Sequence, residues 1–165
     1  MKTLLILRHG KAQPDTPAGG DRARKLTKRG RRDAAAMGAH ILATIGTPDA
    51  IITSDAARAR QTAELAAEAL GFSQPLTIEP SVYAADLPDL LAVLRAIPDD
   101  VDTALLVGHN PGFEELTAAL ASRDEEEATL PTAALARIDL DVSRWDGVEK
   151  GTGVLRGITT PRSLT

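Results

Sequence analysis

Cysteine is absent from this chain, and aromatic side chains are scarce. None of the 165 residues is a cysteine, which excludes disulfides, zinc–thiolate sites and cysteine nucleophiles and suits a reducing compartment. The aromatic residues number four, namely Phe72, Tyr83, Phe113 and Trp145. The core must therefore be aliphatic, and few platforms remain on which the bases of a single-stranded nucleic acid could stack.

The chain also lacks an excess of positive charge and any long apolar run. Its formal net charge of −4 argues against a nucleic-acid partner, because binding to phosphate backbones needs a broad positive surface. No stretch approaches the roughly twenty apolar residues of a membrane span. The opening segment MKTLLILRHG is too short in apolar residues for a signal peptide. We expect a soluble, cytoplasmic protein with no membrane partner, folded as a single domain over residues 1–165.

Strand and helix patterns alternate along the chain. Apolar runs bounded by breakers predict strands at Thr3–Leu7, Ala50–Thr53, Leu76–Glu79, Thr103–Val107, Ala134–Leu140 and Val154–Thr159. Helical periodicity fills the intervals between them, with predicted N-caps at Thr27, Ser54, Asp86 and Asn110. Strands that alternate with helices of this length predict a three-layer α/β/α sandwich with a mostly parallel central sheet.

Cationic and imidazole side chains follow three of the predicted strands. The segments are LRHG, TSDAARAR and VGHNPG, which supply Arg8, His9, Arg58 and His109. Ligands bind outside the carboxyl ends of strands in open α/β sheets. We expect the backbone at Gly10 and the helix starts at Ser54 and Asn110 to approach the ligand, with Lys11 helping to attract it. The cluster holds no carboxylate, so its natural guest is a phosphoryl group.

Two histidines in a phosphoryl site predict catalysis as well as binding. A neutral imidazole is a competent nucleophile, and nearby arginines disfavour its protonation. The arginines also stabilise the charge on the transferring oxygens, so we expect neither a metal nor a cofactor. One histidine would attack phosphorus, and the other would hydrogen-bond the oxygens. His40 falls within a helical pattern and has no spacing that predicts a three-histidine zinc site.

The three blocks RHG, TSDAARARQTAE and VGHNPG resemble the motifs of the histidine phosphatase superfamily, the phosphoglycerate-mutase-like enzymes. The resemblance implies that His9 is the phosphorylated nucleophile and that Arg8, Arg58 and His109 complete the phosphate pocket. The segments RKLTKRGRRDA and EPSVYAAD are similar to the SixA-type phosphohistidine phosphatases, a branch with short chains. That likeness implies a phosphohistidine phosphatase with a phosphoglycerate-mutase-like fold.

The glutamate acid that larger branches of the superfamily carry has no counterpart, because Pro80 stands at its position. Alkyl phosphates need such an acid to protonate the leaving alkoxide. A phosphoramidate can take up a proton before its bond breaks, so the sequence favours phosphohistidine on a protein. Asp15 and Asp86 remain candidate acids supplied from loops. The alternatives are a small-molecule phosphomonoesterase using Asp86, and a catalytically silent phosphate-binding module.

A dense basic cluster follows the first loop and is open to two interpretations. It consists of Arg22, Arg24, Lys25, Lys28, Arg29, Arg31 and Arg32. It is either a solvated helix face with its approach loop, or a docking surface that steers an acidic phosphoprotein toward the site. The partner is accordingly a phosphorylated protein, such as a histidine-phosphorylated signalling protein, or a small phosphate ester.

Overall fold

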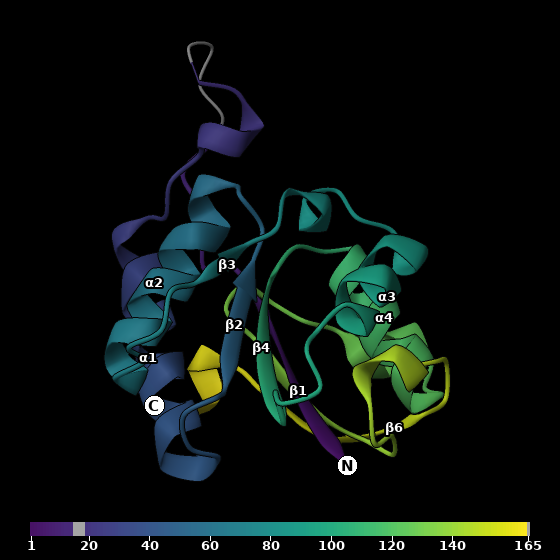
Figure 1. Cartoon of the computed structure of the whole chain (residues 1–165). Coiled ribbons are helices and arrows are strands. Elements are labelled where there is room, and N and C mark those ends of the chain that lie inside the picture. The colour runs from purple at the N-terminus through teal and green to yellow at the C-terminus, as the bar shows by residue number, and fades with distance from the viewer. Residues whose placement is uncertain (15–18, 165) are drawn as a thin grey trace.

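A central sheet of six strands organises the computed structural model, which describes residues 1–14 and 19–164 (Figure 1). The strand order is β3-β2-β4-β1-β5-β6. The bounds are β1 Lys2–Arg8, β2 Ala50–Thr53, β3 Thr77–Ile78, β4 Thr103–Gly108, β5 Leu135–Leu140 and β6 Gly153–Thr159. Strands β1 to β4 pair in parallel, whereas β5 and β6 run antiparallel to their neighbours. The prediction of a mostly parallel sheet is confirmed.

Helices cover both faces of this sheet (Figure 1). Helices α1 Lys28–Thr44 and α2 Ala57–Leu70 lie on one face, and α3 Leu87–Arg95 and α4 Gly112–Ala121 lie on the other. Short 3-10 helices occur at η1 Asp21–Ala23, η2 Pro80–Val82, η3 Glu125–Ala128, η4 Trp145–Gly147 and η5 Pro161–Leu164. None of the described helices has the length and apolar character to cross a membrane. The three layers match the predicted sandwich.

The alternation of side chains along β1 explains why its sequence is continuously apolar. Leu4 and Ile6 belong to the core between the sheet and helices α3 and α4, together with Phe113. Leu5 and Leu7 belong to the opposite core, beneath α1 and α2. Successive residues of a strand face opposite sides of the sheet, so a strand covered on both faces needs apolar residues at every position.

Two of the predicted helix caps are confirmed. Thr27 caps α1, and its side chain accepts a hydrogen bond from the backbone N–H of Gly30. Asp86 caps α3 through a capping box in which Asp86 and Asp89 each accept the other's backbone N–H. Both satisfy N–H groups that have no partner within their own helix.

The predicted caps at Ser54 and Asn110 are wrong, because α2 and α4 have other N-cap residues. The N-cap of α2 is Ala56, and Ser54 Oγ lies 2.8 Å from a ring nitrogen of His109. The N-cap of α4 is Pro111, and Asn110 Nδ2 donates to a distant backbone carbonyl. Each helix therefore begins later than predicted, and each polar side chain becomes part of the loop at a strand end.

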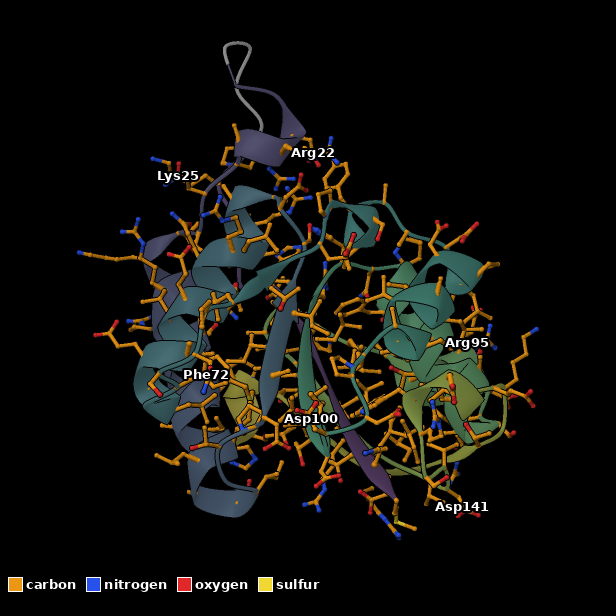
Figure 2. All side chains as sticks on the ribbon, viewed as in Figure 1. Arg22, Lys25, Phe72, Arg95, Asp100 and Asp141 are labelled. Carbon is orange, nitrogen blue, oxygen red and sulfur yellow. The ribbon has the colours of Figure 1, made fainter. Side chains whose placement is uncertain are left out.

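The carboxyl ends of the parallel strands meet at one edge of the molecule. The loop that carries η1 rises above this edge (Figure 1). Figure 2 places Arg22 and Lys25 there, at the far end of the molecule from Asp141. The residues that follow β1, β2 and β4 thus lie beneath η1, which is distant in the sequence from the residues after β4.

Candidate active site

The ends of β1 and β4 place two histidines side by side. Arg8 pairs with Gly108 in the parallel register of these strands, so the next residues, His9 and His109, leave the sheet together. Their ring centroids are 5.2 Å apart. Each histidine is only 8% exposed. The register of the sheet therefore fixes a buried imidazole pair.

A cavity of about 290 Å³, which we call the first cavity, opens beside this pair. Its wall consists of Arg8, His9, Lys11, Ala12, Arg24, Arg58, His109, Asn110 and Thr132. The structure thus brings together the four residues expected to be catalytic, and places the predicted ligand contacts Lys11 and Asn110 on the same wall. Every charged side chain lining the first cavity is a cation, which suits a phosphoryl guest.

The His9 ring is held with one particular nitrogen free. Its Nδ1 lies 2.7 Å from the carbonyl oxygen of Gly10, and a carbonyl only accepts, so Nδ1 carries the hydrogen. Nε2 then keeps its lone pair. Burial lowers the pKa of His9 to about 3, and the charges of His109, Arg58 and Arg8 act in the same direction. His9 is therefore a neutral imidazole near neutral pH, with Nε2 available as a nucleophile.

The His109 ring has the complementary arrangement. Ser54 Oγ already accepts from the backbone N–H of Ala56, so its own hydrogen can be donated to His109 Nε2 at 2.8 Å. In the tautomer that accepts from Ser54, Nδ1 carries the hydrogen, and it has no partner within the described residues. Burial, followed by the charge of Arg58, lowers the pKa of His109 to about 4. His109 is thus a neutral hydrogen-bond donor without an acceptor. A phosphoryl oxygen would supply that acceptor.

One backbone carbonyl positions two further side chains of the first cavity. Leu130 O accepts from Arg8 Nη1 at 3.0 Å and from Asn110 Nδ2 at 2.9 Å. The N–H of Leu130 donates to Glu114 at 2.7 Å. Burial lowers the pKa of the Arg8 guanidinium, whereas the nearby Glu114 opposes that shift. Arg8 Nε and Asn110 Oδ1 are buried without a partner in the described part of the chain.

Residues of the segment ARQT, 59–62 on α2, hold the backbone around the first cavity in place. Thr62 Oγ1 donates to the carbonyl of Arg58 at 2.7 Å and accepts from Gly10 N–H at 3.0 Å. Gln61 Oε1 accepts from the N–H of Leu26 at 2.8 Å. A Cβ on Gly10 would lie 2.7 Å from the carbonyl oxygen of Gly30. Gly10 thus packs closely against Gly30, and its N–H is engaged by Thr62.

A carboxylate that the sequence pattern did not indicate also belongs to the site. Asp21, on η1, accepts from Arg58 through both its carbonyl oxygen, at 2.8 Å, and its carboxylate, at 2.9 Å. Tyr83 OH and Arg24 donate to the same carboxylate. These bonds, that from Tyr83 first, hold the pKa of Asp21 far below its ordinary value, and Asp21 in turn raises the pKa of Tyr83. Asp21 follows no predicted strand, so the strand-end rule gave no signal for it.

Arg24 also belongs to the site, although the sequence pattern grouped it with the basic cluster. It lines the first cavity, and its Nε donates to the carbonyl of Gln13 at 2.7 Å. Most of the cluster behaves otherwise, because Arg22, Lys25, Lys28, Arg29, Arg31 and Arg32 are exposed. The basic cluster thus contributes Arg24 to the site, and its other residues form a charged surface.

A second cavity of about 410 Å³ adjoins the first. The two cavities share Arg58, His109 and Asn110. The rest of the second wall is Asp21, Tyr83, Ala84, Ala85, Asp86, Pro111, Gly112 and Glu115. Asp86, a candidate acid, therefore lies near the phosphate pocket, whereas Asp15 lies outside the described residues.

Glu79 and His40 lie outside both cavities. Glu79 lines neither, and its carboxylate accepts from the backbone and hydroxyl of Ser81. His40, on α1, lines a separate cavity with Arg137 and Arg156. Within residues 1–14 and 19–164, no group of three or more metal-ligating side chains could hold a metal ion.

Comparison with known proteins shows the family to which this chain belongs. Residues 4–87 match the family model of the histidine phosphatase superfamily, branch 1. The protein Rv1276c of Mycobacterium tuberculosis, whose name assigns no activity, is 32% identical over 94% of this chain and 100% of its own length. The chain belongs to the histidine phosphatase superfamily. The resemblance found in the sequence motifs is therefore confirmed.

Solved structures place the chain close to one type within that superfamily. A protein from Agrobacterium tumefaciens assigned as a phosphohistidine phosphatase SixA has a TM-score of 0.80 and 27% identity, covering 97% of this chain and 99% of that one. Its counterpart from Nakamurella has a TM-score of 0.82 and 26% identity, covering 97% and 96%. The SixA-type fold is thus shown.

The fold is shared with enzymes of other substrates. The mycobacterial glucosyl-3-phosphoglycerate phosphatase Rv2419c superposes with a TM-score of 0.69 at 16% identity, covering 95% of this chain and 98% of that one. A likeness at that identity concerns the fold alone. The chain is a histidine phosphatase by family, and its substrate must be argued from its own residues.

Proposed function

We propose that the chain is a phosphatase that works through a phosphohistidine intermediate on His9 and acts on phosphohistidine in a protein. The observation that carries the proposal is that two adjacent histidines, both with the hydrogen on Nδ1, leave different ring nitrogens without a partner. His9 presents a bare Nε2 and His109 an unpartnered Nδ1–H beside the same cationic cavity. One ring is prepared to attack phosphorus and the other to hold a phosphoryl oxygen.

In the first step, His9 Nε2 attacks phosphorus and the bond from phosphorus to the leaving group breaks. Arg8 and Arg58 line the cavity and balance the charge on the phosphoryl oxygens, so the positive charge comes from guanidinium groups. His9 retains its Nδ1 hydrogen throughout, because Gly10 O holds it. The phosphorylated ring is therefore a cation, which is a good leaving group for the next step.

In the second step, water attacks phosphorus and the P–Nε2 bond breaks. The electron pair returns to Nε2, so His9 is again neutral with its hydrogen on Nδ1. The product leaves as dihydrogen phosphate, which gives a proton to solvent. No carboxylic acid is needed in this half-reaction, because Gly10 O keeps the proton on His9 that makes the imidazole a stable leaving group.

The first cavity has no carboxylic acid among its described lining residues, which favours phosphohistidine as the substrate. Neither Glu79 nor Pro80 lines the first cavity, and Asp21 is held ionised by Tyr83, Arg24 and Arg58. An ionised carboxylate cannot protonate a leaving alkoxide. A phosphohistidine enters with its own proton on the far ring nitrogen, and so it suits this site better than a sugar phosphate. The likeness to SixA proteins supports the same substrate class.

The test is a substrate panel with wild type, His9→Ala and His40→Ala. We expect wild type to hydrolyse a phosphohistidine protein faster than any sugar phosphate, and His9→Ala to lose at least about a thousandfold in kcat/KM. His40→Ala is the matched control, since His40 lies outside both cavities. An acid-labile phosphate trapped on wild type should map to His9 by mass spectrometry.

Two outcomes would contradict the proposal in different ways. Rapid turnover of sugar phosphates with phosphohistidine untouched would favour the small-molecule phosphomonoesterase, with Asp86 as its acid. Phosphate binding without turnover, and no activity for His9→Ala to lose, would favour the silent binding module.

A further inference from the structure

The second cavity lies where a leaving group would depart. His9 lines only the first cavity, whereas Arg58, His109 and Asn110 line both. A nucleophile and a leaving group stand on opposite sides of phosphorus during transfer. A phosphoryl group held between His9 and the shared wall therefore directs its leaving group into the second cavity.

Carboxylates distinguish the second cavity from the first. Asp21, Asp86 and Glu115 all line it. The carboxylate of Asp21 is taken by Arg24, Arg58 and Tyr83, and that of Asp86 caps α3 by accepting from Asp89 N–H. Glu115 has no side-chain hydrogen bond or ion pair among the described residues, although it is partly buried.

The position of Glu115 on α4 explains only part of how its carboxylate is stabilised. A carboxylate in the first turn of a helix is stabilised by the helix dipole, and Glu114 fills the same turn. Glu114 has a partner, the backbone N–H of Leu130. Glu115 instead lines a cavity that is also lined by His109, an 8% exposed side chain whose buried Nδ1 has no partner among the described residues. Two residues that each carry an unpartnered polar group thus line the same cavity.

We propose that the second cavity is a subsite for a cationic leaving group and that Glu115 selects it. The proposal rests on the phosphohistidine activity proposed above. Gly10 O keeps a proton on the far nitrogen of His9, and Glu115 does the same for the imidazole of the substrate. The substrate ring enters protonated, and its P–N bond breaks with the electron pair returning to that nitrogen. Phosphorus becomes bonded to His9 Nε2, and the substrate leaves as neutral imidazole with its proton on the far nitrogen.

The same subsite discriminates against anionic leaving groups. A phenolate or a carboxylate-bearing sugar phosphate would bring negative charge toward Glu115, Asp86 and Asp21. Like charges that share a cavity repel each other, and the repulsion is stronger where the cavity is partly buried. The specificity of the enzyme for phosphoramidates over phosphate esters would thus have a physical origin outside the phosphate pocket.

Glu115→Gln tests the subsite, because glutamine keeps the size of the side chain and removes its charge. We expect kcat/KM for a phosphohistidine peptide to fall about ten- to hundredfold, the usual range for one hydrogen bond to a charged group. Activity toward an activated aryl phosphate, whose phenolate leaves without a proton, should be unchanged or higher. The matched control is Glu125→Gln, at an exposed residue of η3 that lines neither cavity.

The ratio of the two activities separates a selective role from a structural one. A variant damaged in folding loses both activities together, and Glu115→Ala then repeats the test with a different side chain. Equal changes toward both substrates in both variants would overturn the subsite. If wild type forms phospho-His9 from the peptide and Glu115→Gln is as active as wild type, the subsite fails and the proposed function survives. If wild type leaves the peptide untouched, both fail.

Discussion

The two cavities share one wall, but their other walls come from different kinds of structure. The first cavity is built on residues that directly follow β1 and β4, where backbone register and burial fix His9 and His109. The second is built from η1, the loop before α3 and the first turn of α4, which contribute Asp21, Asp86 and Glu115. We infer that the rigid wall performs the phosphoryl chemistry and the more exposed wall selects what is cleaved.

Among the substitutions that compare the two walls, the largest effect is expected at the wall they share. Arg58→Ala should lower kcat/KM by about a hundred- to a thousandfold toward every substrate, because one buried donor to the phosphoryl oxygens is lost. Arg58 is 7% exposed, and its Nε has no partner in the described residues. Steady-state kinetics with both a phosphohistidine peptide and an aryl phosphate measure this. A loss confined to the peptide would place Arg58 with the selective wall instead.

Sequence alone indicated Arg8, His9, Arg58 and His109 of the first wall because these residues are local to strand ends. His9, His109 and Arg58 stand within a few positions of apolar runs, and parallel strands bring their carboxyl ends together. Arg24 of the first wall and Asp21 of the second follow no such rule. Both reach the site through a loop whose path depends on bonds to Gln13 and Arg58.

The wrong helix caps have the same origin. Ser54 and Asn110 are residue types that favour N-caps, and a local pattern assigned them that role. The structure uses Ser54 to orient His109 and Asn110 to bond Leu130. These partners lie 55 and 20 residues away in the sequence. A local pattern cannot weigh such contacts against a cap.

The two buried histidines of the first cavity should make the stability of the protein depend on pH. The pKa of His9 is held at about 3 and that of His109 at about 4, both below the ordinary value near 6.5. Between these values the unfolded chain binds more protons than the folded one, so stability falls as the pH drops below 6.5. We expect each histidine to contribute a loss of about 1–2 kcal/mol in the free energy of unfolding from pH 7 to pH 5.

Urea unfolding of His109→Asn at the two pH values measures that contribution. The variant should lose less stability than wild type on acidification, because its side chain takes up no proton on unfolding. His40→Asn serves as the matched control, at a histidine that lines a separate cavity. The same loss on acidification in His109→Asn and wild type would show that His109 is not buried as a neutral ring.

A smaller effect is expected where Asp21 joins the two walls. Its carboxylate competes with a phosphoryl group for Arg58, since both are anions near one guanidinium. Asp21→Asn keeps most of the hydrogen-bonding shape and removes the charge, so inorganic phosphate should inhibit severalfold more strongly. Inhibition constants for phosphate provide the measurement. Weaker inhibition would mean that Asp21 chiefly holds Arg58 in place.

The smallest effect is expected from the exposed residues of the basic cluster, which line neither cavity. Arg22 and Lys25 lie at the edge of the molecule that carries both cavities (Figure 2), and Arg32 is exposed on α1 without an ion pair among the described residues. If the cluster steers an acidic phosphoprotein, Arg32→Glu should raise the KM for that protein a few-fold at low salt, and less at high salt, where such attraction is screened.

The charge-matched control for Arg32→Glu is Lys150→Glu. Lys150 is exposed on the segment between η4 and β6 and lines neither cavity. Both substitutions change the net charge equally, so a general effect of charge would appear in both. Turnover of a small aryl phosphate should be the same in both variants, because it makes no use of the surface. Equal KM values for the phosphoprotein would reduce the cluster to a solvated helix face and leave substrate choice to the second cavity alone.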